Sequence, residues 1–186
     1  LVKRGKKQIM KALIVIDMQN DFCKPNGSLY NSAAEEIIPN IRMLIDKAFE
    51  NDDIIIFTQD THDYDYFQTQ EGKNLPIEHC LSGTEGWRIV DELDIKNIPG
   101  NMVYHYYKDA FGYNDWDCSD IPHDIEEIVV CGTITSICVL TNVCLLKTYF
   151  PEVPIKVYAN CCADLTPEAH QAALTCMKAI QVEVIE

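Results

Sequence analysis

The chain has 186 residues, 47% of them hydrophobic, which is enough for one domain with a sizeable core. Its formal net charge of −14 argues against nucleic acid and anionic membrane surfaces as partners. Nine cysteines without regular spacing or a CxxC pair are typical of reduced thiols in a cytoplasmic protein, and they argue against a disulfide framework and a structural zinc site.

The start of the chain lacks the long apolar segment of a signal peptide, and no apolar run approaches the length of a membrane span. Met10 followed by Lys11 resembles a natural start, so we expect residues 1–9 to be an N-terminal extension or a remnant of cloning. No internal repeat or low-complexity linker divides the rest, which predicts a single domain over residues 10–186.

Two continuous apolar runs in the first third of the chain each end in an acid. They are Lys11–Asp17 (KALIVID) and Asp53–Asp60 (DIIIFTQD), and both predict buried parallel strands. Between them, apolar residues at helical spacing predict a helix over residues 37–48. The following segment, Thr61–Leu93, has no clean period, and long irregular segments inside compact domains are usually functional or mobile.

Strands and helices alternate through the second half of the chain. Further strands are predicted at Val103–Tyr107, Ile128–Cys131, Ile155–Ala159 and Val182–Ile185, and helices at Val139–Tyr149 and after Thr166. This alternation predicts an α/β fold with a doubly wound, mainly parallel six-stranded sheet and helices on both faces, a three-layer Rossmann-like architecture. The dinucleotide fingerprint GxGxxG is absent, which argues against a nucleotide-binding module.

One cysteine stands out by its position in residues 129–140, VVCGTITSICVL. A buried strand is followed by a turn at Gly132, and Cys138 comes where the next helix is expected to begin. Backbone N–H groups and the helix dipole there would favour a thiolate and could hold an oxyanion. The alternative is a small buried apolar residue, which free cysteine often is.

Two further reactive groups lie at predicted strand ends, Asp17 and Lys108. The carboxyl ends of strands in a doubly wound sheet meet along one edge, which would bring both close to Cys138. An acid can take the thiol proton, and a lysine can hold the thiolate and orient the acid. Taken singly, a turn residue and a solvated lysine are the simpler explanations, so the triad is predicted from the joint placement.

A second group of polar residues follows the Asp53–Asp60 strand. It contains Asp60, His62, Glu71 and His79. Two imidazoles and two carboxylates suit a divalent metal ion, Zn²⁺ or alternatively Mn²⁺ or Fe²⁺. The D-x-H spacing at a strand end allows both side chains to face one centre. A polar loop with solvated charges is the alternative explanation.

Four motifs occur in one order along the chain: IVIDMQNDFC, the D-x-H segment followed by EHCLSGTEGW, KDAF at Lys108, and GTITSICV. With them the chain resembles the isochorismatase-like cysteine hydrolases, and within these the nicotinamidases, from about Lys11 to the C-terminus. The resemblance implies an Asp17–Lys108–Cys138 triad that converts nicotinamide to nicotinate and ammonia through a cysteine thioester. The alternatives are hydrolysis of another small amide, ureido or carbamoyl compound, and a non-catalytic binding protein on the same scaffold.

The resemblance also assigns roles around the nucleophile. It implies a cis peptide bond between Thr133 and Ile134, with the backbone N–H groups of Ile134 and Cys138 as oxyanion donors. Phe22 matches the residue that stacks on the substrate ring. Ser136 stands where the family usually has an acidic residue.

For the metal, the resemblance implies Asp60, His62 and His79 as ligands, with Glu71 as the fourth and Asp65 and Glu78 as its rivals. The aromatic residue that usually precedes the HC motif is missing, so the substrate wall is expected from other aromatics. The candidates are Trp87, which we prefer, and Tyr64, Tyr66, Phe67 and Tyr113. The family further implies a homo-oligomer, while His105, His123 and His170 are read as structural.

Overall fold

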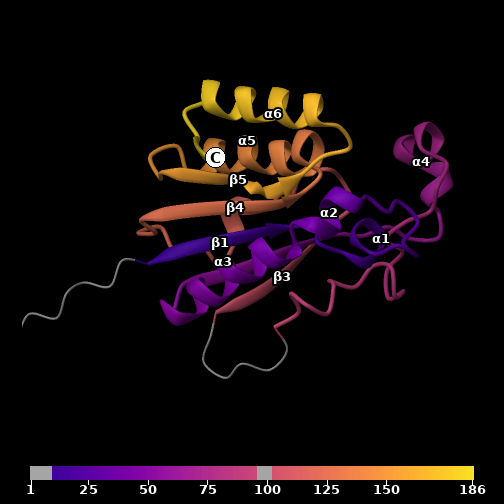
Figure 1. Cartoon of the computed structure of the whole chain (residues 1–186), viewed down its shortest axis with the longest axis horizontal. Helices are drawn as coiled ribbons and strands as arrows, with labels where there is room; N and C mark the ends of the chain where they lie inside the picture. The colour runs from indigo at the N-terminus through magenta and orange to yellow at the C-terminus, as the bar shows by residue number, and fades with distance from the viewer. Residues whose placement is uncertain (1–9, 96–101) are drawn as a thin grey trace, which may run out of the picture.

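The computed structural model describes residues 10–95 and 102–186, so the expectation for residues 1–9 lies outside the described residues. Among the described residues, six strands form one sheet in the order β3-β2-β1-β4-β5-β6 (Figure 1). Every neighbouring pair is parallel. The strands are β1 (Lys11–Ile16), β2 (Ile54–Asp60), β3 (Val103–Lys108), β4 (Glu127–Thr133), β5 (Ile155–Ala163) and β6 (Glu183–Ile185). The predicted doubly wound sheet is confirmed, and it is wholly parallel.

Helices lie on both faces of this sheet. The α-helices of the described residues are α1 (Asn20–Cys23), α2 (Ser32–Glu36), α3 (Ile38–Glu50), α4 (Gln70–Asn74), α5 (Leu140–Tyr149) and α6 (Pro167–Ala179), and Figure 1 shows α4 away from the sheet. In Figure 1, α3 packs along β1 on one side of the sheet, and α5 and α6 lie together on the other. None of the helices in the described ranges is long and apolar enough to cross a membrane.

The central strands are buried on both faces, which explains their unbroken apolar sequences. Residues 12–16 of β1 and all seven residues of β2 are buried. Helix α3 turns Ile38, Ile41 and Ile45 into this core, as its helical spacing predicts. Helix α6 begins as its sequence indicates, because the side chain of Thr166 accepts a hydrogen bond from the N–H of Ala169 at 3.1 Å.

The order of the strands creates a crevice at the carboxyl ends of β1 and β4. From β1 the chain moves to β2 on one side, and from β4 it moves to β5 on the other, so β1 and β4 flank the topological switch point. Gly132 allows this close approach: its φ is +126°, and an added Cβ would lie 2.1 Å from the carbonyl oxygen of Ile16. Glycine therefore brings the segment after β4 next to the segment after β1.

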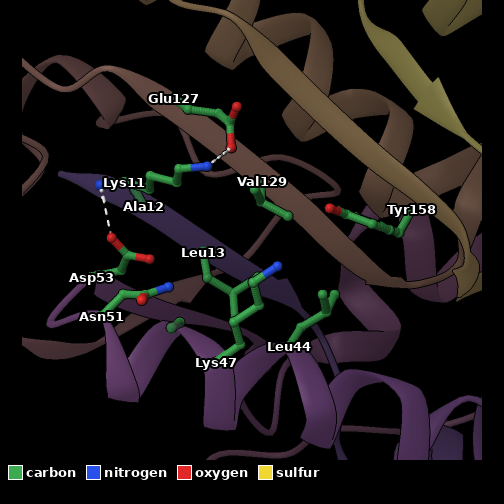
Figure 2. Close-up of a pocket in the computed structure, with 11 residues that line it drawn as sticks. Lys11, Ala12, Leu13, Leu44, Lys47, Asn51, Asp53, Glu127, Val129 and Tyr158 are labelled. Atoms are coloured by element: carbon green, nitrogen blue, oxygen red, sulfur yellow. Dashed lines mark hydrogen bonds and ion pairs between the residues drawn. The ribbon is translucent and has the colours of Figure 1, made fainter. Parts of the chain in front are cut away.

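The opposite end of the sheet carries a cluster of paired charges. Figure 2 shows Lys11 with its ammonium on Glu127 and its backbone N–H on Asp53. The two carboxylate oxygens of Glu127 lie 2.6 Å from the Nζ of Lys11 and 2.9 Å from the Nζ of Lys156. Burial favours a higher pKa for Glu127, but the hydrogen bonds from both lysines outweigh it and the pKa is lowered.

Replacing Glu127 with glutamine is expected to lower the free energy of unfolding by about 1 kcal/mol at pH 7, since two partly buried ion pairs are lost. A carboxylate with a lowered pKa in the folded state stabilises the protein above its unfolded pKa, and this stabilisation is lost as the pH falls through the folded pKa. The difference between wild type and variant should therefore shrink below about pH 4. Urea unfolding across pH measures it. Glu85→Gln, in an exposed pair with Arg88, is the control and should change the stability by less than about 0.5 kcal/mol; an equal loss in both would contradict the prediction.

Candidate active site

Asp17 lies directly after β1, completely buried at the carboxyl edge of the sheet. Its φ of +50° turns the chain sharply, and its N–H donates to the carbonyl oxygen of Thr58 on β2. The Thr58 hydroxyl donates to Asp17 Oδ1 at 2.7 Å, which fixes the carboxylate plane. Among the described residues, no well-aligned hydrogen bond reaches the other oxygen, Oδ2. That oxygen is the one turned toward the reactive groups.

Lys108 is the last residue of β3 and lies across the sheet from Asp17. Its buried Nζ is 2.7 Å from Asp17 Oδ2, 3.2 Å from Asp60 Oδ1 and 3.7 Å from Cys138 Sγ. Burial alone would lower the pKa of this ammonium, but the facing carboxylates and the thiol raise it well above its usual value. Lys108 therefore remains a cation between two carboxylates.

Cys138 is buried in a single π-helical turn, Thr135–Val139, that leads into α5. The expectation that this site favours a thiolate is wrong for the resting protein. Burial, together with the charges of Asp17 and Asp60, raises the pKa of the Cys138 thiol well above its usual value despite Lys108. Burial likewise raises the pKa of Asp17 above its usual value, because Lys108 compensates only in part. The site thus holds a neutral thiol beside a carboxylate with raised proton affinity.

The peptide bond between Thr133 and Ile134 is cis, at the position that the resemblance implies. The carbonyl oxygen of Ile134 accepts hydrogen bonds from the N–H groups of Ile137 and Val139, both at 3.1 Å. These bonds fold the segment back on itself around Cys138. Thr133, Ile134 and Cys138 consequently line the same cavity.

Asp60, His62, Glu71 and His79 come together as one potential metal-binding group, with ligand atoms all within 4.8 Å of one another. The Nε2 atoms of His62 and His79 lie 3.1 and 3.3 Å from Asp60 Oδ2. Burial would lower the pKa of His79, but hydrogen bonds to Asp60 and Glu71 raise it to about 10, so the carboxylates favour positive charge here. The donor set therefore fits a divalent cation. The rivals Asp65 and Glu78 are exposed and outside this group.

A cavity of about 390 Å³ joins the nucleophile to the potential metal ligands. Cys138 lines it together with Asp60, Glu71 and His79. Phe22 also lines it and packs against the ring of His79, with 5.8 Å between the ring centroids. The remaining wall is mainly apolar: Leu29, Tyr30, Leu75, Phe111, Ile137 and Leu165.

The structure places the preferred wall residue, Trp87, away from this cavity. Its indole N–H donates to the Thr61 hydroxyl at 2.9 Å, and its ring packs on Tyr107. Tyr64, Tyr66, Phe67 and Tyr113 do not line the cavity either. Leu75, close to the position of the missing aromatic, and Phe111, three residues after Lys108, are there instead. Sequence reasoning missed both, although the KDAF motif offered a signal for Phe111.

Known proteins resemble this chain in sequence and in fold. The Isochorismatase domain family matches residues 11–186. The chain is 28% identical over 169 residues to the nicotinamidase of Saccharomyces cerevisiae, covering 70% of this chain and 78% of that protein. It is 25% identical over 182 residues to a protein of Arabidopsis thaliana described as a "probable inactive nicotinamidase", covering 92% of this chain and 90% of that one.

The structure is also similar to the crystal structure of the nicotinamidase/pyrazinamidase PncA from Bacillus subtilis. The TM-score is 0.84 with 30% sequence identity, and the match covers 95% of this chain and 100% of that chain. The family match in sequence and the match in fold both extend over nearly the whole chain. The protein therefore belongs to the isochorismatase family.

Proposed function

We propose that this protein is an amide hydrolase that converts nicotinamide to nicotinate and ammonia. The observation that carries the proposal is the shared cavity, which Cys138 lines together with Asp60, Glu71 and His79, three members of the potential metal-binding group. A cysteine nucleophile accounts for cleavage of an amide, and a cation site in the same cavity accounts for recognition of a ring nitrogen. The buried Asp17–Lys108 pair supplies a base beside the thiol.

In the first half of the reaction, Asp17 takes the proton of the Cys138 thiol and Sγ attacks the carboxamide carbon. The charge that develops on the carboxamide oxygen is held by the backbone N–H groups of Ile134 and Cys138, and one such donor typically contributes a few kcal/mol. Asp17 then gives its proton to the departing nitrogen, so the C–N bond breaks and ammonia leaves. A thioester remains on Cys138.

In the second half, Asp17 is again a carboxylate and takes a proton from water, whose oxygen attacks the thioester carbon. The C–S bond breaks, Asp17 returns its proton to Sγ, and the nicotinic acid that is released loses the second water proton to solvent and becomes nicotinate. Lys108 stays charged throughout, since it faces both Asp17 and Asp60. Its role is to hold Asp17 in place and to stabilise the transient thiolate 3.7 Å away.

The metal-binding group would orient the pyridine ring of nicotinamide. A divalent ion held by Asp60, His62, Glu71 and His79 would accept the pyridine nitrogen as a ligand. Phe22, packed on His79, offers an apolar surface to the ring face. Zn²⁺ is our first choice and Mn²⁺ or Fe²⁺ the alternatives, because mixed imidazole and carboxylate donors suit all three.

Ammonia release from nicotinamide by the purified protein, before and after chelation, tests the proposal. We expect turnover to fall at least about tenfold on chelation and to return with added metal, since ligand-site changes usually cost 10–100-fold. His79→Ala should lower metal content and turnover together, whereas the exposed His123→Ala should leave both unchanged. No turnover of nicotinamide under any metal would contradict the proposed substrate.

A second candidate is hydrolysis of another small amide, ureido or carbamoyl compound by the same cysteine. Leu75 lines the cavity where the family usually has an aromatic residue, so stacking on a flat substrate ring is weaker. A panel of carbamoyl and ureido compounds separates the two candidates. Ammonia release from one of these, with none from nicotinamide, would favour the second candidate.

A further inference from the structure

A carboxylate outside the triad is hydrogen-bonded to the segment that carries the nucleophile. Strand β5 ends at Ala163, which pairs with Thr133 at the end of β4. The next residue, Asp164, is only 7% exposed, and its Oδ2 accepts the backbone N–H of Ser136 at 2.7 Å. Ser136 lies between the cis peptide and Cys138, so this bond fixes the middle of the nucleophile segment, residues 133–138.

The same residue also holds two other parts of the cavity. Asp164 Oδ1 accepts the backbone N–H of Leu165 at 2.7 Å, and the Asp164 carbonyl oxygen accepts the Asn31 side-chain N–H at 3.0 Å. Leu165 lines the cavity, and so does Tyr30, the residue before Asn31. Asp164 thus connects the nucleophile segment with Leu165 and with the segment around Tyr30, both of which line the cavity.

The position of Asp164 favours a strong bond. Ser136 is the second residue of the π turn that leads into α5, so its N–H belongs to the positive end of a helical segment. A carboxylate that accepts such an N–H forms a charge-assisted hydrogen bond. Thr135 is held independently, with its Oγ1 2.9 Å from His170 Nδ1 on α6. Asp164 therefore anchors the nucleophile segment at Ser136, and His170 anchors it at Thr135.

We propose that Asp164 is a positioning residue for catalysis: its carboxylate sets the place of residues 133–138, so that the N–H groups of Ile134 and Cys138 face the reacting carbonyl. The expected effect on kcat rests on the proposed amide hydrolysis. The expected effect on the position of residues 133–138 does not. Asp164 is not among the residues that line the cavity. Its effect is transmitted through Ser136, and it should act on the transition state more than on substrate binding.

The kinetic test compares Asp164→Ala and Asp164→Asn with wild type on nicotinamide. We expect the alanine variant to lower kcat by about 100-fold, with KM changed by less than about threefold, because small displacements of oxyanion donors reduce the rate by this order. Asparagine retains one acceptor oxygen and should restore kcat to within about fivefold of wild type. A decrease in kcat of less than threefold in the alanine variant would overturn the proposal. Failure of the asparagine variant to restore kcat would overturn it as well.

Asp53→Ala is the matched control. Asp53 is 6% exposed and accepts a backbone N–H, that of Lys11, but lies at the far end of the sheet. Its variant should lose thermal stability as Asp164→Ala does while keeping kcat. Equal loss of kcat in both variants would show that Asp164 acts only through overall stability.

Amide hydrogen exchange separates this proposal from the proposed substrate, because it needs no turnover. Peptides covering residues 133–139 should exchange at least about tenfold faster in Asp164→Ala than in wild type or Asp53→Ala. If wild type hydrolyses no nicotinamide but this exchange rises, the proposed substrate fails and the positioning role of Asp164 stands. If nicotinamide is hydrolysed and the exchange does not change, the positioning role fails alone.

Discussion

Replacing Cys138 with alanine is expected to reduce ammonia release from nicotinamide by about 10⁴-fold or more, since loss of a covalent nucleophile removes the acylation step altogether. The fold should persist, because a small buried side chain is replaced by another. Ammonia release measures the first effect and thermal unfolding the second. Mass spectrometry of the acid-quenched reaction should detect an acyl adduct on wild type and none on the variant.

Cys161→Ala is the control for this substitution. Cys161 is 3% exposed, and burial raises the pKa of its thiol to about 11, so it shares the environment of Cys138 without the charged neighbours. It should keep turnover within about twofold of wild type. Full turnover by Cys138→Ala would contradict the thioester mechanism. Equal loss in both variants would indicate that cavity formation in the core, and not chemistry, lowers the rate.

The strands and their ends could be predicted because burial on both faces leaves a simple signal. Asp17 and Asp60 end apolar runs, and a parallel sheet brings such ends to one edge. The helical spacing of apolar residues before β2 is an equally clear signal, and it predicts α3. Helix α6 is less clear. Helical spacing predicts an apolar face of Ala169, Ala173, Cys176, Met177 and Ile180, but the helix buries Ala173, Leu174 and Met177 and exposes Cys176.

The cavity wall and the electrostatics were much less accessible to sequence reasoning. Leu165 follows β5 and Phe111 follows β3, and both line the cavity from loops. Loops have no hydrophobic periodicity, so their path could not be predicted from the sequence. Trp87 is predicted as a wall residue because the usual aromatic is missing, but its hydrogen bond to Thr61 holds it elsewhere. The raised pKa of the Cys138 thiol results from burial, with a further contribution from Asp17 and Asp60, which are distant from it in sequence, so only the folded arrangement gives the direction of the shift.

Replacing Lys108 with methionine is expected to lower the free energy of unfolding by about 3–5 kcal/mol at pH 7, because removing one partner leaves buried carboxylates without a counter-ion. Methionine is unbranched and only one heavy atom shorter than lysine, so packing changes little. Turnover of nicotinamide should fall by at least about 10²-fold, since Asp17 loses its orientation and the thiolate its cation. Urea unfolding and ammonia release measure the two effects, and Lys24→Met, in the partly exposed pair with Glu92, should show neither.

The stability deficit of this variant should depend on pH in a direction that burial determines. The pKa of Asp17 is raised even with Lys108 present, and loss of the ammonium raises it further. A carboxyl group whose folded pKa lies above its unfolded pKa destabilises the protein at high pH, and the cost disappears as the pH falls below the folded value and the group takes up a proton. The gap between wild type and Lys108→Met should therefore narrow from pH 8 toward about pH 5. A variant as stable as wild type at pH 7 would contradict the prediction, because Lys108 would then not stabilise the ionised forms of Asp17 and Asp60 that face it.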